Sequence, residues 1–196
     1  MSFLQGRAAR VVTLAILAAG LILLANGLFI PAKALVAQIL LERAWNASKQ
    51  GAAMKPWPWA DTRPVARIEV PRLGQRAIVL AGGSGQAMAF GPTHMPNTPL
   101  PGQGGTSVIA GHRDTHLAFL RDVRPGDTII VTLAGGQVLR FVAGESRIVH
   151  ARGSTIDPDR GGGRLALVTC WPFEARLRGP LRYVLFARPE AVGTTR

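Results

Sequence analysis

Two patterns of apolar residues divide the chain. Residues 11–30 contain no charged side chain, and as a helix they would extend about 30 Å, the thickness of a bilayer's hydrocarbon core. From Pro64 onward, apolar residues alternate with polar ones in short runs, which is the period-two pattern of β-strands. We therefore predict an N-terminal transmembrane helix followed by a mainly β domain.

The flanks of the apolar stretch predict its orientation. Arg7 and Arg10 precede it, and basic residues favour the cytoplasmic side, so the chain after residue 30 is expected to be exported. A cleaved signal peptide is the alternative, but the apolar core is longer than usual and only Ala32-Lys33-Ala34 offers a cleavage site. The expected segments are a cytoplasmic N-terminus (1–10), an anchor (11–30), a stalk helix with a Pro/Trp linker (31–63) and a folded domain (64–196).

The stalk and linker show two further patterns. Apolar residues at helical spacing in Ala34–Ser48 predict a helix that restarts after Pro31. Lys55-Pro56-Trp57-Pro58-Trp59 contains two residues without an amide donor and predicts a stiff extended linker. Its tryptophans either lie at the level of the lipid headgroups or pack on the domain.

Eight short runs in the folded domain predict strands. Such strands, separated by turn signals, favour a closed or half-closed barrel, because closure removes exposed edges. Gly135-Gly136 predicts a tight hairpin. Short helical turns are expected at Gly85–Phe90 and His116–Val123. The predicted strands are Ala66–Val70, Arg76–Leu80, Thr106–Ala110, Thr128–Leu133, Gln137–Val142, Arg147–His150, Leu165–Cys170 and Leu181–Ala187.

Charge and cysteine content narrow the functional classes. The chain has 23 Lys and Arg against 11 Asp and Glu, a formal net charge of +12. The arginines are scattered and form no stripe, which argues against nucleic-acid binding. A basic surface beside a membrane would instead attract anionic headgroups. The single cysteine, Cys170, cannot form an internal disulfide, so in an exported domain it is expected to have a chemical role.

Three residues at strand boundaries have the chemistry of thiol acyl transfer. Cys170 ends an apolar strand and would attack a peptide carbonyl. His112, just after another strand, titrates near neutrality and would shuttle the proton. Arg182 is permanently cationic and would stabilise the oxyanion and the thiolate. Thr169 is expected to position substrate or to contribute to the oxyanion site.

These segments together resemble the sortase family of membrane-anchored transpeptidases. The resemblance runs from about Val65 to Arg188. It rests on Leu167-Val168-Thr169-Cys170, on Gly111-His112-Arg113-Asp114 and on Arg182, twelve residues after the cysteine. It implies an eight-stranded sortase-type barrel, with the catalytic domain over 64–196. Asp114 resembles the acidic residue that often follows the family's catalytic histidine, and we expect it to orient that histidine or to be structural.

The resemblance also implies a substrate and a location. The expected substrate is a secreted protein with a C-terminal sorting signal of Leu-Pro-x-Thr-Gly type, and the acceptor is an amine that the chain does not specify. Arg176 and Arg178 border the expected substrate groove. The Pro/Trp linker, the arginine-rich composition and the Thr169–Phe173 segment are most similar to sortases of Gram-negative bacteria (class GN). This implies an inner-membrane protein with its catalytic domain in the periplasm.

Three alternatives remain open at this stage. His112 and His116 with His94 could form a zinc site, although no general-base Glu follows the first histidine. A tethered, non-catalytic β domain that binds an envelope partner explains the anchor and charge, but not the three strand-end residues. Cysteine transpeptidases of the peptidoglycan cross-link class need a histidine just before the cysteine, which is missing here. We expect no metal and no cofactor.

Neighbouring residues have simpler interpretations. Arg113 is predicted to be a solvated loop arginine, His94 a structural hydrogen-bond partner in a turn, and His150 a surface histidine.

Overall fold

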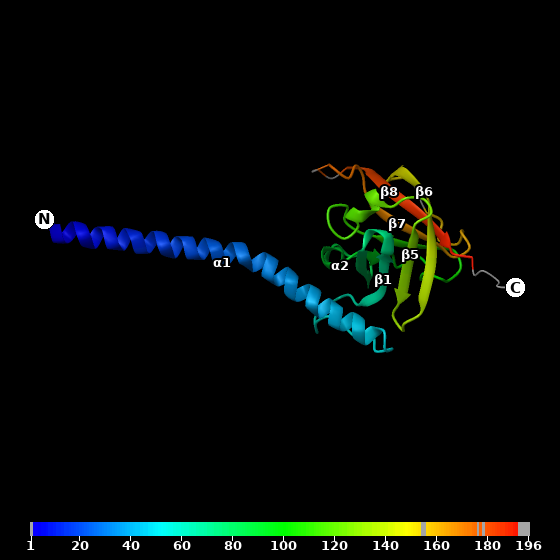
Figure 1. Cartoon of the computed structure of the whole chain (residues 1–196), viewed down its shortest axis with the longest axis horizontal. Helices are drawn as coiled ribbons and strands as arrows, with labels where there is room; N and C mark the ends of the chain where they lie inside the picture. The colour runs from blue at the N-terminus through cyan, green and yellow to red at the C-terminus, as the bar shows by residue number, and fades with distance from the viewer. Residues whose placement is uncertain (1, 154–155, 176, 178, 192–196) are drawn as a thin grey trace. The chain divides into compact units, whose positions relative to one another are not determined.

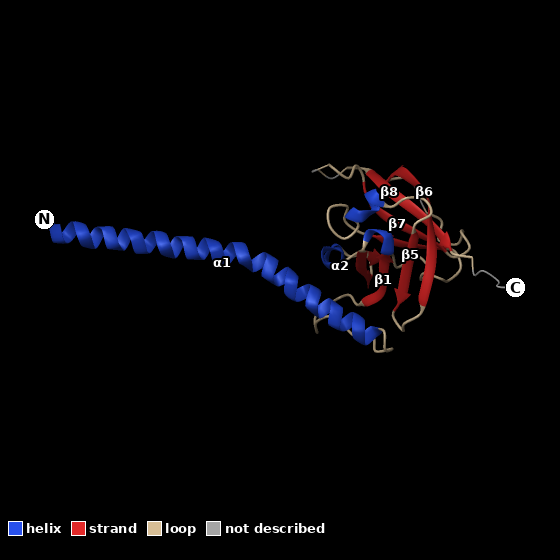
Figure 2. Ribbon diagram, in the orientation of Figure 1, coloured by secondary structure: helices blue, strands red, loops and turns tan. Residues whose placement is uncertain are grey.

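The folded domain is a closed barrel of eight strands among the residues that the structure describes (Figures 1 and 2). This computed structural model describes residues 2–153, 156–175, 177 and 179–191, with residues 2–9 described by their backbone only. The strands are β1 (Pro64–Val70), β2 (Gln75–Ala81), β3 (Thr93–His94), β4 (Thr106–Ala110), β5 (Thr128–Leu133), β6 (Val138–His150), β7 (Arg164–Cys170) and β8 (Leu181–Pro189).

The barrel closes in the order β1-β2-β3-β4-β7-β8-β6-β5, with β5 pairing back to β1. The β2–β3 and β4–β7 pairs are parallel, and the other pairs are antiparallel. Two strands far apart in sequence, β4 and β7, are therefore neighbours and run in the same direction. Their C-terminal ends meet at one end of the barrel, where both predicted nucleophile and predicted proton shuttle are found.

The predicted fold class is confirmed, with two differences in the strands. The runs predicted at 137–142 and 147–150 form one long strand, β6, which has an irregularity between Ala143 and Ser146. Strand β3 was not predicted, because two residues are too short to show a period. The helical turns are found as α2 (Gly85–Phe90) and a 3-10 helix, η2 (Ala118–Asp122), and a further 3-10 helix, η1 (Pro71–Leu73), follows β1.

The core of the barrel is formed by alternate residues of the strands. On β7, Leu165 and Leu167 are fully buried in this core, whereas Ala166 and Val168 belong to a second apolar cluster. Side chains alternate between the two faces of a strand, so the second cluster lies on the outer face of the barrel. This alternation also decides which face each site residue occupies.

Helix α1 (Ser2–Ser48) is continuous through Pro31, so the expected restart of the helix is not seen. The chain divides into two compact units, residues 1–39 and 40–196. Within the first unit, the apolar side chains from Val11 to Ile30 are exposed. By length and composition, α1 is able to cross a membrane.

The end of α1 belongs to the barrel unit. Leu41 and Trp45 are buried in a small cluster with Ile78 and Leu80 of β2. The guanidinium of Arg67 lies 5.2 Å from the Trp45 ring centre. The burial of these apolar side chains fixes the last helical turns to the outside of the barrel.

The two linker tryptophans differ in their surroundings. Trp57 packs edge-on against Phe90 of α2, with ring centres 4.9 Å apart. Trp59 is 82% exposed. Of the two locations predicted for these tryptophans, packing on the domain is therefore found only for Trp57.

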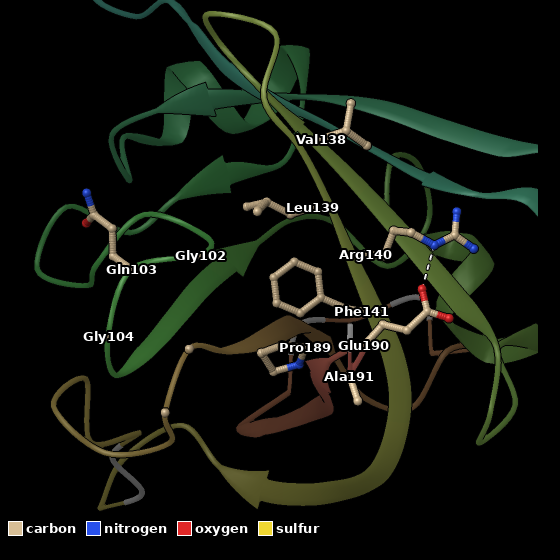
Figure 3. A pocket seen from close by; sticks show the side chains of 12 residues that line it. Gly102, Gln103, Gly104, Val138, Leu139, Arg140, Phe141, Pro189, Glu190 and Ala191 are labelled. Atoms are coloured by element: carbon tan, nitrogen blue, oxygen red, sulfur yellow. Dashed lines mark hydrogen bonds and ion pairs between the residues drawn. The ribbon is translucent and has the colours of Figure 1, made fainter. Parts of the chain in front are cut away.

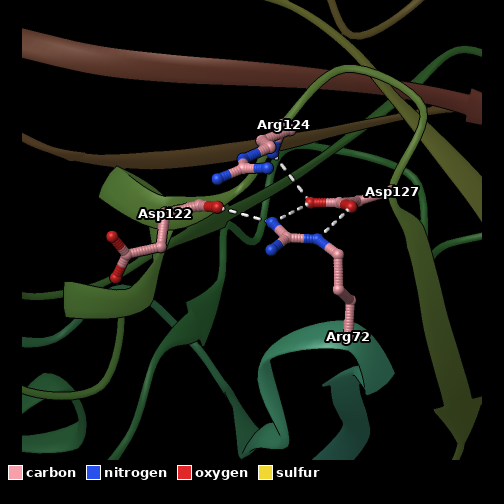
Figure 4. A network of polar contacts seen from close by, with 4 residues as sticks. All are labelled: Arg72, Asp122, Arg124 and Asp127. Carbon is pink, nitrogen blue, oxygen red and sulfur yellow. Dashed lines mark hydrogen bonds and ion pairs between the residues drawn. The ribbon is translucent and has the colours of Figure 1, made fainter.

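An ion pair joins η1 to the start of β5 (Figure 4). Arg72 donates to both carboxylate oxygens of Asp127, at 2.6 and 2.7 Å, and to the Asp122 carbonyl at 2.6 Å. The Asp127 carboxylate also accepts a bond from the Arg124 amide. These bonds, led by that from Arg72, lower the pKa of Asp127 below its ordinary value.

Candidate active site

The cysteine and the arginine predicted for catalysis are direct partners across two strands. Cys170, the last residue of β7, pairs with Arg182 of β8 in the antiparallel register. Alternation along β7 and β8 places both side chains on the outer face, opposite the core residues Leu167 and Leu185. Directly opposed residues have Cβ atoms about 5 Å apart. The free Cys170 thiol is partly exposed, so a substrate on the outer face could reach it.

The guanidinium of Arg182 is held by the loop that follows the cysteine strand. Its Nη1 donates to the carbonyl oxygens of Gly179 and Leu181, both at 2.9 Å. Arginine has further donors on Nε and Nη2. The loop bonds therefore orient the group without using its whole donor set.

His112 follows strand β4, whose C-terminal end lies beside that of β7. In the parallel β4–β7 pair, Ala110 is opposite Val168, and the Gly111 amide continues the ladder by donating to the Val168 carbonyl at 3.0 Å. His112 comes two residues after this last strand pair, at the same end of the barrel as Cys170, the last residue of β7. His112 is exposed. The structure thus brings Cys170, His112 and Arg182 to one end of the β4–β7–β8 sheet.

Gly111 leaves no room for a side chain at this crossing. A Cβ atom there would lie 3.0 Å from Leu117 and 3.1 Å from Pro92. Because Gly111 has no side chain, the backbone directly before His112 can pack closely against Leu117 and Pro92.

Thr169 joins the cysteine strand to the histidine segment. Its side chain is 2% exposed, and its hydroxyl donates to the Gly111 carbonyl at 2.8 Å. It lies on the face opposite to Cys170. This placement fits an orienting role, made through the backbone that leads to His112.

Asp114 and His116 surround the predicted proton shuttle. Asp114 is exposed, and His116 is half-buried. Burial lowers the pKa of His116, and the nearby His112 lowers it further, against the opposing effects of a hydrogen bond to the Ala89 backbone and of the Asp114 charge. Burial thus disfavours the charged form of His116, and its hydrogen bond to the Ala89 backbone ties the histidine segment to α2.

Arg113 was predicted to be solvated, and this prediction is wrong. The side chain is only 8% exposed, and its Nη2 donates to the carbonyl oxygens of Ala175 and Leu177, the latter at 2.8 Å. Both carbonyls belong to the β7–β8 loop. The two acceptors are distant in sequence, so the local pattern around Arg113 could not indicate that its side chain is buried.

Aromatic side chains near Cys170 pack together against the core of the barrel. Trp171 stacks on Tyr183, with ring centres 6.0 Å apart, and Phe173 contacts both rings. The guanidinium of Arg121 lies 5.8 Å from the Phe173 ring centre. The sequence Trp171-Pro172-Phe173 showed the aromatic residues, but only the pairing of β7 with β8 shows that they pack together.

A second apolar cluster lies on the outer face of the barrel, on the same face of β7 and β8 as Cys170 and Arg182. It is built on three buried residues from three adjacent strands, Val108, Ala166 and Val184. Partly buried apolar side chains surround them, namely Met95, Val149, Ile156, Val168 and Phe186. We call this set the outer apolar face.

The remaining predicted residues are placed as follows. His94 is buried, with Nε2 3.0 Å from the Pro99 carbonyl oxygen, and His150 is exposed, so both structural interpretations are confirmed. Arg176 and Arg178 lie outside the described residues. Within the described part of the chain, no three His, Cys, Asp or Glu side chains are grouped to hold a metal ion.

The domain also contains a large cavity, and Figure 3 shows the residues that line it. Its volume is about 860 Å³, and its walls include Gly102, Leu139, Phe141, Gly163 and Pro189. Gly163 precedes β7 and Pro189 ends β8, so the cavity is at the opposite end of these strands from Cys170 and Arg182. Six residues of strand correspond to about 20 Å. The cavity is therefore separate from the candidate active site.

The domain is a closed eight-stranded barrel in which a lone thiol is paired with a cross-strand arginine. Comparison with known proteins identifies its family. Residues 68–190 match the Sortase domain, which is more than half of the chain, so the chain belongs to the sortase family. Sortases are transpeptidases that act on proteins bearing sorting signals at the cell envelope.

Individual relatives agree with this assignment. The chain is 24% identical to Sortase D of Bacillus subtilis over 144 residues, which is 73% of this chain and 71% of that protein. Sortase E of Streptomyces avermitilis is 27% identical with a TM-score of 0.55, over 65% of this chain and 88% of that one. Sortase A of Corynebacterium diphtheriae shares the fold, at 22% identity and a TM-score of 0.61, over 82% and 86% of the two chains.

Proposed function

We propose that this protein is a cysteine transpeptidase that cleaves a C-terminal sorting signal of Leu-Pro-x-Thr-Gly type and transfers the protein to an amine at the cell envelope. The observation that carries the proposal is the direct pairing of Cys170 with Arg182, with His112 just beyond the end of the adjacent strand β4. These are the nucleophile, the cation and the proton carrier that acyl transfer to a thiol requires.

The first half of the reaction forms a thioacyl enzyme. The Cys170 thiolate adds to the threonine carbonyl carbon of the signal, and the developing oxyanion is stabilised by donors of the Arg182 guanidinium. The tetrahedral intermediate then collapses, and the bond between threonine carbon and glycine nitrogen breaks. Protonated His112 gives its proton to the departing amine.

The second half transfers the acyl group. The amine acceptor attacks the thioester carbon, and His112, now neutral, takes a proton from the amine. The carbon–sulfur bond breaks, which regenerates the Cys170 thiolate. The protein substrate thereby ends in a new amide bond, and the enzyme returns to its starting state.

The outer apolar face is the natural surface for the signal peptide. It lies on the same face as Cys170 and includes Val168 and Val184, which neighbour Cys170 and Arg182 along their strands. The leucine and proline of the signal are apolar, and their burial against the partly exposed members of this face, such as Val168 and Phe186, would contribute favourable free energy. The polar part of the peptide would then lie at the end of the barrel that carries Arg182 and Asp114.

The proposed position in the cell is based on the length and composition of α1. We propose residues 1–10 as the cytoplasmic segment, 11–30 as an uncleaved anchor, 31–63 as stalk and linker, and 64–196 as the catalytic domain. The arginine-rich composition and the linker favour a Gram-negative sortase with its domain in the periplasm. Reporter fusions after residue 50 and the intact mass of the membrane-bound protein test this placement. Cytoplasmic reporter activity, or a mature N-terminus near Ala34, would contradict it.

A trapping experiment tests the catalytic assignment. Full-length protein in detergent is incubated with a labelled Leu-Pro-x-Thr-Gly peptide and an amine, and intact mass spectrometry follows the thioacyl adduct. We expect the adduct in the wild type and none in Cys170→Ala. Turnover by Cys170→Ala would refute the nucleophile, and binding without cleavage by the wild type would indicate a tethered binding domain instead.

A further inference from the structure

Arg113 is a buried cation directly after the proposed catalytic histidine. The side chain is 8% exposed, although no ion pair with an acidic residue is found for it among the described residues. Its adjacent acid, Asp114, is exposed. Burial of a charge without a counter-ion is costly unless hydrogen bonds replace its water. For stability alone, an apolar side chain of similar size would serve as well at this position.

Arg113 contacts a loop that is distant in sequence and that connects two of the proposed catalytic residues. Its Nη2 donates to the carbonyl oxygens of Ala175 and Leu177. These two residues are 62 and 64 positions away in sequence, in the loop that runs from the end of β7 to the start of β8. This loop leads from Cys170 to Arg182, and it also supplies the Gly179 carbonyl that holds the Arg182 guanidinium.

The three proposed catalytic residues differ in how they are held. The ladder between β7 and β8 sets Cys170 against Arg182. His112, in contrast, lies beyond the end of β4, in a segment of turns. On one side of this segment, the Gly111 amide donates to Val168 and the Gly111 carbonyl accepts from the Thr169 hydroxyl, and on the other side Arg113 bonds to the β7–β8 loop.

We propose that Arg113 is a positioning residue for the reaction. Its guanidinium bonds two carbonyls of the β7–β8 loop and thereby fixes His112 with respect to Cys170 and Arg182. Both bonds come from one nitrogen, Nη2, whose two hydrogens point in directions fixed by the guanidinium plane, whereas the donors of an ammonium rotate freely. This inference deepens the proposed transpeptidase function and rests on it.

The test compares two substitutions in the full-length protein in detergent. Arg113→Met keeps the length of the side chain but removes all donors, whereas Arg113→Lys keeps the charge. We expect Arg113→Met to lower kcat/KM for the sorting-signal peptide by about 10–100-fold, mainly through kcat, because misplacing a catalytic group by about 1 Å costs this much. Arg113→Lys should lie between Arg113→Met and the wild type.

Two measurements without substrate separate positioning from general damage. Hydrogen exchange should become faster in the β7–β8 loop of Arg113→Met, while exchange in β1 stays unchanged. The rate of Cys170 alkylation by iodoacetamide should stay within about threefold of the wild type, since the small reagent needs no aligned histidine. Arg140→Met is the matched control, because Arg140 is exposed and pairs with Glu190 at the other end of the barrel.

The outcomes are distinct. Unchanged loop exchange in Arg113→Met, or wild-type turnover by Arg113→Lys together with wild-type loop exchange, would overturn the proposal. If Arg113→Met does not fold, Arg113→Lys carries the same comparison. If the wild type forms no adduct with any sorting-signal peptide, the proposed function fails, and the exchange measurement still decides whether Arg113 holds the loop.

Discussion

The hydroxyl of Thr169 donates to the carbonyl of Gly111 over 2.8 Å, which joins the residue before Cys170 to the residue before His112. This bond runs between two parallel strands that are far apart in sequence. The Thr169 side chain is buried on the face of β7 opposite to the Cys170 side chain. From this side, the bond can link the position of the proposed nucleophile to that of the proposed proton carrier.

Thr169→Val tests this coupling, because valine has the same shape and lacks the hydroxyl. The buried Gly111 carbonyl would lose its partner, which usually costs about 1–3 kcal/mol. We expect a lower melting temperature and an acylation rate that falls by roughly threefold to thirtyfold. Thr132→Val on β5 is the control, since that residue is far from the site in the strand order. Equal acylation by both variants would show that the bond serves stability alone.

Gly105→Ala should disrupt the loop between β6 and β7. A Cβ atom on Gly105 would lie 2.0 Å from the Pro158 carbonyl oxygen, and the residue has a φ of +87°. The loop is held here by the bond from the Thr106 amide to Pro158, at 2.8 Å. The overlap must displace this backbone, so we expect a loss of several degrees in melting temperature and a change in peptide KM.

Gly126→Ala is the matched control for this substitution. Gly126 has a similar φ of +93°, but nothing lies within 4 Å of its Cβ position. It should therefore show only the backbone penalty of about 1 kcal/mol. Thermal unfolding of both variants checks the difference, and equal losses would mean that the contact with Pro158 is relieved at little cost.

Asp127 is expected to make stability depend on pH. Its pKa is lowered in the folded state, mainly by the bond from Arg72, so it binds protons more weakly when folded than when unfolded. This contribution is present above the unfolded pKa and is lost as pH falls through the folded pKa. Asp127→Asn should melt a few degrees lower near neutral pH, and the difference should shrink below about pH 4. A constant difference at all pH values would contradict the role of this ion pair.

Arg182→Lys and His112→Ala should affect different steps. The lysine keeps the charge but loses the planar donor set, so acylation should fall by about 10²–10³-fold with substrate binding less affected. His112→Ala removes the leaving-group acid, so cleavage of peptide should fall while acylation by an activated ester is partly spared. The acylation rates with both substrates decide this. Equal losses on both for His112→Ala would mean that another residue protonates the amine.

Much of this fold is encoded locally. The charge-free run 11–30 predicts a membrane-spanning helix, and period two predicts most strands, because both depend on how nearby side chains partition between apolar and polar surroundings. Strand β3 escaped prediction because its two residues are defined by pairing with β2 and β4, not by a pattern. The single long β6 was predicted as two strands, and the gap between them coincides with the irregularity between Ala143 and Ser146.

The sequence by itself determined which residues could do the chemistry: a lone thiol, a histidine and an arginine each stood at a strand boundary. Only the tertiary structure decided that Cys170 faces Arg182, because register depends on pairing between strands and not on either strand alone. It alone also placed Arg113 in the interior, where its Nη2 donates to two carbonyls more than 60 residues away. A long polar side chain reads as solvated until the chain folds a distant loop over it, and that contact is a property of the fold as a whole.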